Sequence, residues 1–294
     1  MKKIIDVTET SYIHLFLNNL IFTKNGVKIM IPTKDIETLI IENTHLTISI
    51  ALINKLVDNG VNIIICDEKH LPNALLIPYH KYYSVKNLQN QITWNLDFKT
   101  KAWQLIVKTK IFNSLKILKT LKLLNKENED KIINYSNSIV GLDFSNAEAH
   151  VAKLYFKLLF GEKFKRSDEE NFINRYLNYG YSILLSYIVR SLCNKGFDVR
   201  LGLFHKSYSN NFALATDIIE PFRCLIDLHL YKYIKSNELL SFKDYKKVIF
   251  DIFEEFIFFK NENVKVSKYI DLFVEEILVK NNFEKELYFE RIKG

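Results

Sequence analysis

Glycine, proline and cysteine are scarce in this sequence of 294 residues, which holds 8 Gly, 4 Pro and 3 Cys. So few glycines argue against glycine-rich phosphate loops and favour long helices. Neither a G-x-G-x-x-G motif nor a Walker A motif is present. The three cysteines include no C-x-x-C pair, so the sequence indicates neither a disulfide framework nor a structural zinc site.

Long apolar runs are missing as well. No stretch approaches 18 residues without a charge, and the first residues reach Asp6 before any apolar segment typical of a secretion signal. Hydrophobic residues make up 48% and charged residues 26%, which is ordinary for a globular protein. We therefore expect a cytoplasmic protein that is not embedded in a membrane.

The whole chain has a formal net charge of +7, and its positive charge is concentrated in one part. Residues 1–80 hold seven Lys against eight Asp or Glu, whereas residues 81–126 hold ten Lys and one Asp. Lys101, Lys108 and Lys119 are spaced by 7 and 11 residues, so they would share one face of a helix. This face is either an ordinary solvated surface or a stripe that follows the phosphates of a nucleic acid.

The hydrophobic pattern predicts an α+β protein with a small β-rich domain and a larger all-α domain. Short apolar runs around Asn25-Gly26 indicate a hairpin, and a helix is expected over 47–59. We place the β-rich domain at 1–78, a linker at 79–84 and the helical domain at 85–294. Helices are expected over 92–124 (one helix or a broken pair), 128–138, 145–160, 169–194, 212–235, 241–260 and 267–280.

Glu148 is the first residue with catalytic potential. Helical spacing places it on the apolar side with Val151 and Tyr155. A buried carboxylate is costly unless a cation, a metal or hydrogen-bond donors accompany it. The alternative is structural: Ser145-x-x-Glu148 is a capping-box pattern, in which Glu148 would bond the backbone at the helix start.

Two further polar positions interrupt apolar segments. His205 ends an apolar run, which would place an imidazole at the rim of a cleft, although a lone histidine is more often structural. Asp217 and Glu220 are three residues apart and would repel each other on a helix unless a cation is near. Pro221 should break that helix, and Arg223 is suited to neutralise one of the two acids.

Two carboxylates and one imidazole form a mostly oxygen ligand set. This set suits Mg²⁺ or Mn²⁺ better than a closed tetrahedral zinc site. Such an ion supports phosphoryl transfer on DNA, because it polarises the phosphate and neutralises developing charge.

Several ordered motifs between residues 100 and 225 resemble those of the CRISPR-associated integrase of spacer acquisition, the first-named of the CRISPR-associated proteins. They are NAEAHVAKLYF at 146–156, LNYGY at 177–181, GLFH at 202–205 and LATDIIEPFR at 214–223. The E-P-F-R form, together with AWQ at 102–104, IV at 106–107 and KI at 110–111, resembles the type II subtype. The first 80 residues are similar only in architecture.

This resemblance implies a site and a reaction. It implies that Glu148, His205 and Glu220 are metal ligands, with Asp217 as an additional catalytic acid beside them. It implies a DNA endonuclease and integrase that joins the 3′-hydroxyls of a captured spacer fragment to the CRISPR repeat by transesterification. Beside the resemblance, we expect Lys101, Lys108, Lys119 and Arg223 to contact the DNA.

The resemblance also implies partners. They are double-stranded DNA (the spacer fragment and the CRISPR repeat), a second copy of the chain bound through the β-rich domain, and a small ferredoxin-like adaptation protein that completes a heterohexamer. For the type II subtype, the RNA-guided effector and an accessory adaptation protein are implied too. Two alternatives stay open: a non-catalytic DNA-binding scaffold, and a metal-dependent nuclease that cuts branched or single-stranded DNA without integration.

Overall fold

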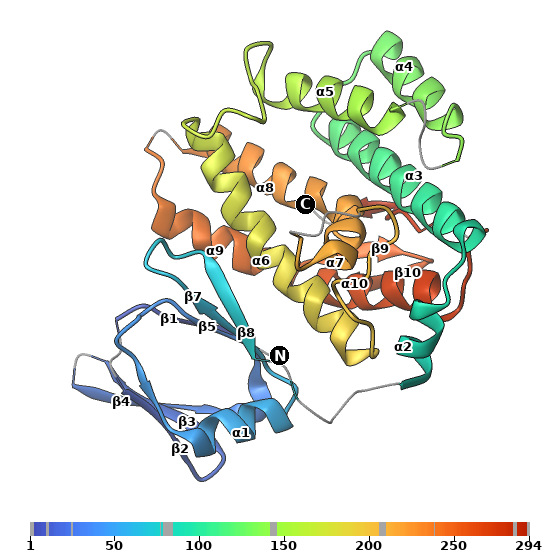
Figure 1. Ribbon diagram of the computed structural model, residues 1–294. Helices are drawn as coiled ribbons and strands as arrows, with labels where there is room; N and C mark the ends of the chain where they lie inside the picture. The colour runs from blue at the N-terminus through green and yellow to red at the C-terminus, as the bar shows by residue number, and fades with distance from the viewer. Residues whose placement is uncertain are drawn as a thin grey trace. The chain divides into compact units, whose positions relative to one another are not determined.

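The computed structural model describes residues 3–9, 12–24, 26–76, 78, 85–141, 146–205, 210–237, 239–284 and 287–292. The chain forms two compact units, Met1–Tyr83 and Ser84–Gly294. Each unit is described by itself below (Figure 1). The whole predicted linker, residues 79–84, lies outside the described residues.

The first unit is built from two four-stranded sheets, as the alternating apolar runs predicted. One sheet has the order β1-β5-β7-β8, with β1, β5 and β7 parallel and β8 antiparallel; the other has the order β4-β3-β2-β6. The predicted hairpin joins β3 to β4, where Lys24 pairs with Val27; Asn25 itself lies outside the described residues. The strands are β1 (Lys3–Val7), β2 (Tyr12–Phe16), β3 (Asn19–Lys24), β4 (Val27–Pro32), β5 (Ile36–Ile41), β6 (Thr47–Ile48), β7 (Asn62–Cys66) and β8 (Pro72–Leu76).

A single apolar core holds the first unit together. Strand β5 is buried along its whole length, and β1 and β7 pair with its two edges. Helix α1 (Ile50–Asp58) adds Leu52 and Leu56 to this core, and a short 3-10 turn, η1 (Thr33–Asp35), precedes β5. Helix α1 begins where the Ser49 hydroxyl accepts a hydrogen bond from the Leu52 amide at 3.3 Å. The helix predicted over 47–59 is therefore confirmed, though it starts three residues later.

The second unit is mostly helical, which confirms the predicted fold class. Its long helices follow the 3.6-residue hydrophobic period of the sequence. The helices are α2 (Val85–Ile92), α3 (Leu96–Thr120), α4 (Lys126–Asn137), α5 (Ala147–Phe160), α6 (Phe172–Asn194), α7 (Ala213–Ile218), α8 (Arg223–Ser236), α9 (Phe242–Ile252) and α10 (Val266–Val274), with a 3-10 turn η2 (Glu220–Phe222) and a π-helical turn η3 (Glu275–Val279).

Of the two possibilities for residues 92–124, the structure has one long helix, α3, which begins after Asn95, whose side chain accepts from the Phe98 amide. Ile92 belongs to the separate helix α2. The helix expected over 241–260 was wrong after Ile252, where a small antiparallel sheet of order β10-β9-β11 follows. Its strands are β9 (Phe256–Phe259), β10 (Glu262–Lys265) and β11 (Arg291–Ile292).

The missed hairpin has a local physical cause. In β9, Ile257 and Phe259 are buried while Phe256 is exposed, which is the two-residue period of a strand. Lys260 and Asn261 both have positive φ, of 50° and 63°, and thereby form the turn that a two-residue hairpin requires. The aromatic run had concealed this alternation within an apparently helical segment.

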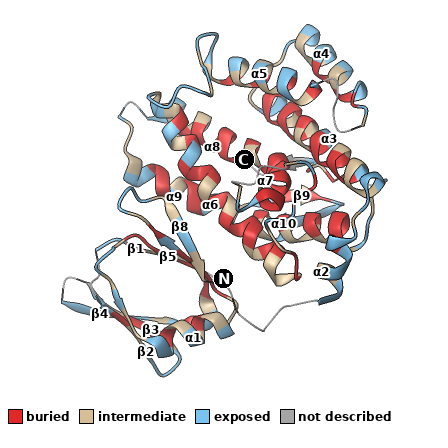
Figure 2. Cartoon of the chain, viewed as in Figure 1, coloured by how far each residue is buried: buried red, intermediate tan, exposed pale blue. Residues whose placement is uncertain are grey.

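Helix α3 is the longest of the described helices. It packs against α5, α8 and η2, while α6 packs against α8, α9 and α10 (Figure 1). Burial runs along the inner faces of these helices (Figure 2). Gly180 brings α6 close to α8: a Cβ atom there would lie 2.4 Å from Ile226 Cγ2. Among the described helices, none combines the length and apolarity that crossing a membrane requires.

Candidate active site

The Lys110 ammonium of α3 joins two glutamates that lie far apart in the sequence. It contacts Glu148 Oε1 on α5 and lies 2.6 Å from Glu220 Oε2 in η2. The Glu220 side chain is 10% exposed and that of Glu148 is 28% exposed. Two of the three residues predicted to bind metal are thus brought together around one positive charge.

Glu148 reaches this position because α5 turns its apolar side toward α3. Val151, Tyr155 and Leu159 are buried on that side, as the helical period predicted. The capping-box alternative depends on Ser145 and stays open. The residue that precedes the helix is Asn146, with φ of 50° and no side-chain capping bond, so Glu148 is the second helical residue. Ser145 lies outside the described residues.

Glu220 is placed by the predicted helix break at Pro221. Helix α7 ends at Ile218, η2 spans the next turn, and α8 begins at Arg223. The buried Asn113 of α3 donates a hydrogen bond from Nδ2 to the Pro221 carbonyl at 2.8 Å. Its Oδ1 accepts from the Phe289 amide at 3.1 Å. Asn113 therefore fixes the break against α3, one helical turn from Lys110.

Arg223 holds the second oxygen of Glu220. Its Nε donates to Glu220 Oε1 at 3.0 Å, and its guanidinium lies over the Tyr181 ring, 4.7 Å from the centroid. Tyr181 in turn donates its hydroxyl proton to the buried Asp227. The guanidinium of Arg166 also lies over Tyr181, 5.3 Å from the centroid. Arg223, predicted to contact DNA, is thus bound to Glu220, which agrees with the alternative that it neutralises one of the acids.

Asp217 organises the loop that carries His205. Its Oδ1 lies 2.5 Å from His205 Nδ1, and its two oxygens accept backbone N–H bonds from Leu203 at 2.6 Å, Phe204 at 3.0 Å and His205 at 3.3 Å. The Asp217 side chain is fully buried. Gly202 is needed here, because a Cβ atom would lie 2.9 Å from the His205 carbonyl oxygen and 3.0 Å from Asp217 Oδ2.

The His205 ring has a fixed orientation. Trp103 of α3 stacks on Phe204 with a centroid distance of 4.3 Å and meets His205 edge to face at 5.9 Å. The His205 side chain is 41% exposed and lines a hollow of about 530 Å³ with Gly202 and Arg200. The expected position of an imidazole at the rim of a cleft is confirmed.

The charges at the site shift the pKa values of its groups. Burial alone would raise the pKa of Glu220, but the Lys110 and Arg223 charges outweigh it and lower this pKa to about 2. Burial lowers the pKa of Lys110, yet the Glu220 and Glu148 carboxylates outweigh burial and leave it raised. The bond to Asp217 raises the pKa of His205 above 6.5. Both Glu220 and Lys110 are therefore charged at neutral pH.

The three predicted metal ligands form two adjacent groups. The charges of Glu148 and Glu220 act on the pKa of His205, but the imidazole bonds Asp217 and the glutamates bond Lys110. Within the described parts of the chain, no three His, Cys, Asp or Glu side chains are arranged to hold one ion. The role of these residues as metal ligands stays a prediction.

The donor chemistry nevertheless fits a hard divalent ion. Carboxylate oxygens from Glu148 and Glu220 already converge on a single cation, the Lys110 ammonium. Because Asp217 holds Nδ1 of His205, Nε2 is the ring nitrogen left for a metal, as in other sites where a carboxylate orients a ligating histidine. Asp217, on α7, makes four bonds to residues 203–205, so its place in the structure is that of a positioning residue.

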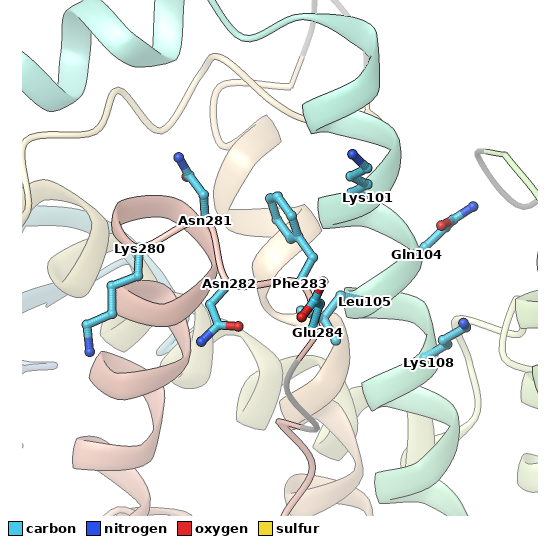
Figure 3. Close-up of a pocket in the computed structure, with 9 residues that line it drawn as sticks. All are labelled: Lys101, Gln104, Leu105, Lys108, Lys280, Asn281, Asn282, Phe283 and Glu284. Carbon is cyan, nitrogen blue, oxygen red and sulfur yellow. The ribbon is translucent and has the colours of Figure 1, made fainter.

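The three lysines of the predicted stripe differ in their surroundings. Lys101 pairs with Asp97 at 2.8 Å and Lys119 with Glu129 at 2.6 Å. Lys101 and Lys108 line a hollow of about 520 Å³ that lies between α3 and the segment after η3, where Lys280 adds a third amine (Figure 3). Lys119 does not line this hollow.

Sequence reasoning missed two functional positions, Lys110 and Asn113. Lys110 appeared only as part of a motif, although it lies seven residues after Trp103 and seven before Ile117, both buried. A lysine at that spacing occupies the inward face of a helix and needs an anionic partner. The sequence therefore contains a signal for Lys110. The partner of Asn113 is a backbone carbonyl, which no side-chain pattern indicates.

Comparison with known proteins agrees with these features. The family model described as "CRISPR associated protein Cas1" matches residues 5–250. A curated protein from Neisseria meningitidis, named CRISPR-associated endonuclease Cas1, is 37% identical over 217 residues, which cover 72% of this chain and 70% of that protein.

Solved structures show the same fold. A structure described as "Casposase bound to integration product" has a TM-score of 0.77 at 18% identity and covers 100% of this chain and 96% of its own. A CAS1 protein from Thermotoga maritima has a TM-score of 0.76 at 13% identity, and the match covers 99% of this chain and 100% of that protein. A chain of a partial Cas6-RT-Cas1–Cas2 complex has a TM-score of 0.63 at 15% identity, with 100% of both covered.

The fold and these matches define a two-unit protein of the CRISPR-associated class. This chain belongs to the Cas1 family.

Proposed function

We propose that this protein is a divalent-metal-dependent DNA endonuclease and integrase of CRISPR adaptation, which joins the 3′-hydroxyl ends of spacer DNA to the CRISPR repeat. The observation that carries this proposal is the pair of mostly buried glutamates, Glu148 and Glu220, which converge on one cation beside an oriented histidine. The curated relative from Neisseria meningitidis is named an endonuclease, and the casposase neighbour was solved with its integration product.

Glu148, Glu220 and Nε2 of His205 would hold Mg²⁺ or Mn²⁺. The bound ion would supply Lewis acidity and neutralise charge on the phosphate. The protein's other groups do the positioning: Arg223 fixes one oxygen of Glu220, and Asp217 fixes the His205 ring and its loop. These groups hold the ligand atoms in place before substrate arrives, which is the main protein contribution to such a reaction.

The proposed reaction needs no external energy source. The 3′-oxygen of the spacer forms a bond to phosphorus as the bond to the leaving 3′-oxygen of the repeat strand breaks. The incoming hydroxyl loses a proton and the leaving oxygen gains one. One phosphodiester replaces another, so neither ATP nor a covalent enzyme intermediate is required.

A joining assay tests this function. With Mn²⁺ present, Glu148→Gln, His205→Ala and Glu220→Gln should each lower spacer joining to a repeat duplex at least ~100-fold. Glu162→Gln is the matched control, because Glu162 is an exposed acid at the far end of α5 that pairs with Lys157. Joining at wild-type rates in the three site variants would contradict the proposal.

The same assay separates the alternatives. A non-catalytic DNA-binding scaffold would give no joined product with any metal. A nuclease of branched or single-stranded DNA would release fragments without joined intermediates. The hollow that Lys101 and Lys108 line supports DNA binding at this unit, since amines there can contact phosphates (Figure 3).

We further propose that the first unit binds a second copy of the chain. Its β2, β3 and β4 region exposes large apolar side chains, as an interface would: Tyr12, Phe16, Leu17, Val27 and Met30. Light scattering should give a dimer mass for the wild type and a monomer mass for a Phe16→Lys and Met30→Lys double variant.

Other partners are expected from the family. A Cas1–Cas2 complex is among the structural neighbours, which supports a second adaptation protein as a partner. That this protein is small and completes a heterohexamer stays a prediction. Contacts with the RNA-guided effector and an accessory adaptation protein stay predictions.

A further inference from the structure

Lys110 occupies the position between the two glutamates where a metal ion would bind. Its ammonium contacts Glu148 Oε1 and lies 2.6 Å from Glu220 Oε2, and its side chain is 17% exposed. These are the oxygens that a divalent ion would use if the proposed metal dependence holds. An ammonium and a divalent cation cannot share them, because two positive charges a few ångströms apart repel strongly in a partly buried site.

The space around this triad is small. The cavity lined by Lys110, Glu148 and Glu220 has a volume of about 40 Å³, which holds no more than about three waters. Mg²⁺ and Mn²⁺ favour several oxygen ligands, and Mg²⁺ gives up its waters reluctantly. An ion with its waters therefore does not fit beside the ammonium unless Lys110 moves.

Lys110 is not needed to hold Glu220 in place. Arg223 binds the other oxygen of Glu220 at 3.0 Å, and Asn113 ties the adjacent Pro221 carbonyl to α3. When Lys110 leaves, these two contacts still orient Glu220.

We propose that Lys110 is an internal competitor for the divalent ion: it neutralises Glu148 and Glu220 until an ion displaces it, and its amine is then freed from both carboxylates. This inference rests on the proposed metal-dependent function. It couples metal loading to the release of a lysine at the site. The competition lowers metal affinity and keeps a positive charge between the two carboxylates before the ion binds.

Mn²⁺ affinity tests the competition directly. Protein is stripped with EDTA and dialysed, and free Mn²⁺ is then measured by electron paramagnetic resonance during titration. Lys110→Met should bind Mn²⁺ at least ~10-fold more tightly than the wild type, because the competing charge is gone. Lys116→Met is the control: it removes the same charge from α3 at a lysine that lies over the Tyr288 ring, and affinity should stay within about twofold. Unchanged or weaker binding by Lys110→Met would overturn the proposal.

A second measurement uses the wild-type chain, in case Lys110→Met fails to fold. Amine labelling followed by mass spectrometry reports how accessible each lysine is. Saturating Mn²⁺ should raise the labelling rate of Lys110 at least ~3-fold and leave Lys116 unchanged. An unchanged or slower rate at Lys110 would show that the ion does not displace it.

The two proposals fail in distinguishable ways. If the wild type joins DNA with Mn²⁺ while Lys110→Met binds the ion no more tightly, the competition is wrong and the function stands. If Lys110→Met binds Mn²⁺ more tightly but no Mn²⁺-dependent joining occurs in the wild type, the competition stands and the proposed function is wrong.

Discussion

The Asp217 carboxylate binds the His205 imidazole, at 2.5 Å from Nδ1, and also the backbone of the loop that carries His205. The carboxylate is fully buried while the imidazole is 41% exposed. The two residues should therefore respond differently to substitution, since one supports the loop and the other faces the cleft.

Asp217→Ala should destabilise the protein by about 2–4 kcal/mol, because it leaves three backbone N–H groups and a ring nitrogen without their acceptor. His205→Ala should cost less than about 1 kcal/mol. Both should abolish joining. Urea denaturation measures the stabilities, and equal destabilisation by the two variants would contradict the separation of roles.

Part of this site was predictable from the sequence because its signals are local. The helical period placed Glu148 on the buried side of its helix, and Pro221 marked the break beside Glu220. The buried face of α5 and the position of η2 agree with those patterns. The α+β fold class followed from the change of hydrophobic period in the same way.

Other parts depend on contacts between distant segments. Lys110 meets Glu148 and Glu220 only because α3 packs against both α5 and η2. The role of Asp217 likewise depends on a loop that begins 15 residues earlier, at Gly202. Such pairings carry no periodic signal, since the sequence separation is set by tertiary packing. The hairpin after Ile252 was missed for a different reason, because four aromatic or apolar residues fit either period.

Asn113→Ala should destabilise the protein by about 2–4 kcal/mol. The substitution leaves the Pro221 carbonyl and the Phe289 amide without their partner in a buried position. The control is Thr120→Ala at the exposed end of α3, where a change within about 0.5 kcal/mol is expected. Thermal or urea unfolding measures the stability of both variants. If the two are equally stable, Asn113 does not fix the break.

The buried Asp227 should make stability depend on pH. Burial raises its pKa to about 6 from the usual 3.8, despite the opposing Tyr181 hydroxyl and Arg223 charge. The folded state therefore keeps this proton between pH 4 and 6 while the unfolded state loses it. The contribution is fully present below about pH 4 and is lost as pH rises through about 6, by about 3 kcal/mol at most.

Asp227→Asn removes this titration. Its free energy of unfolding should lack the fall that wild type shows between pH 4 and 6, so the difference between the two proteins grows with pH in that range. Urea titrations at pH 4, 5, 6 and 7 measure it. A difference that does not change with pH would contradict the raised pKa.

DNA binding should depend more on Lys108 than on Lys119. Lys119 is held by Glu129 at 2.6 Å, whereas Lys108 lines the hollow of Figure 3. Lys108→Ala should lower the slope of log affinity against log salt by about one, and Lys119→Ala by clearly less. Fluorescence anisotropy across a salt series gives both slopes. An unchanged slope for Lys108→Ala would indicate that Lys108 lies on an ordinary solvated surface.

A crystal structure of the protein with Mn²⁺, located by its anomalous scattering, tests the proposed metal site and the displacement of Lys110 together. We expect one Mn²⁺ peak at about 2.0–2.4 Å from carboxylate oxygens of Glu148 and Glu220 and from Nε2 of His205, with the Lys110 ammonium moved away from both carboxylates. If Lys110 still bridges the two glutamates at saturating Mn²⁺ and no peak lies between them, both proposals are wrong.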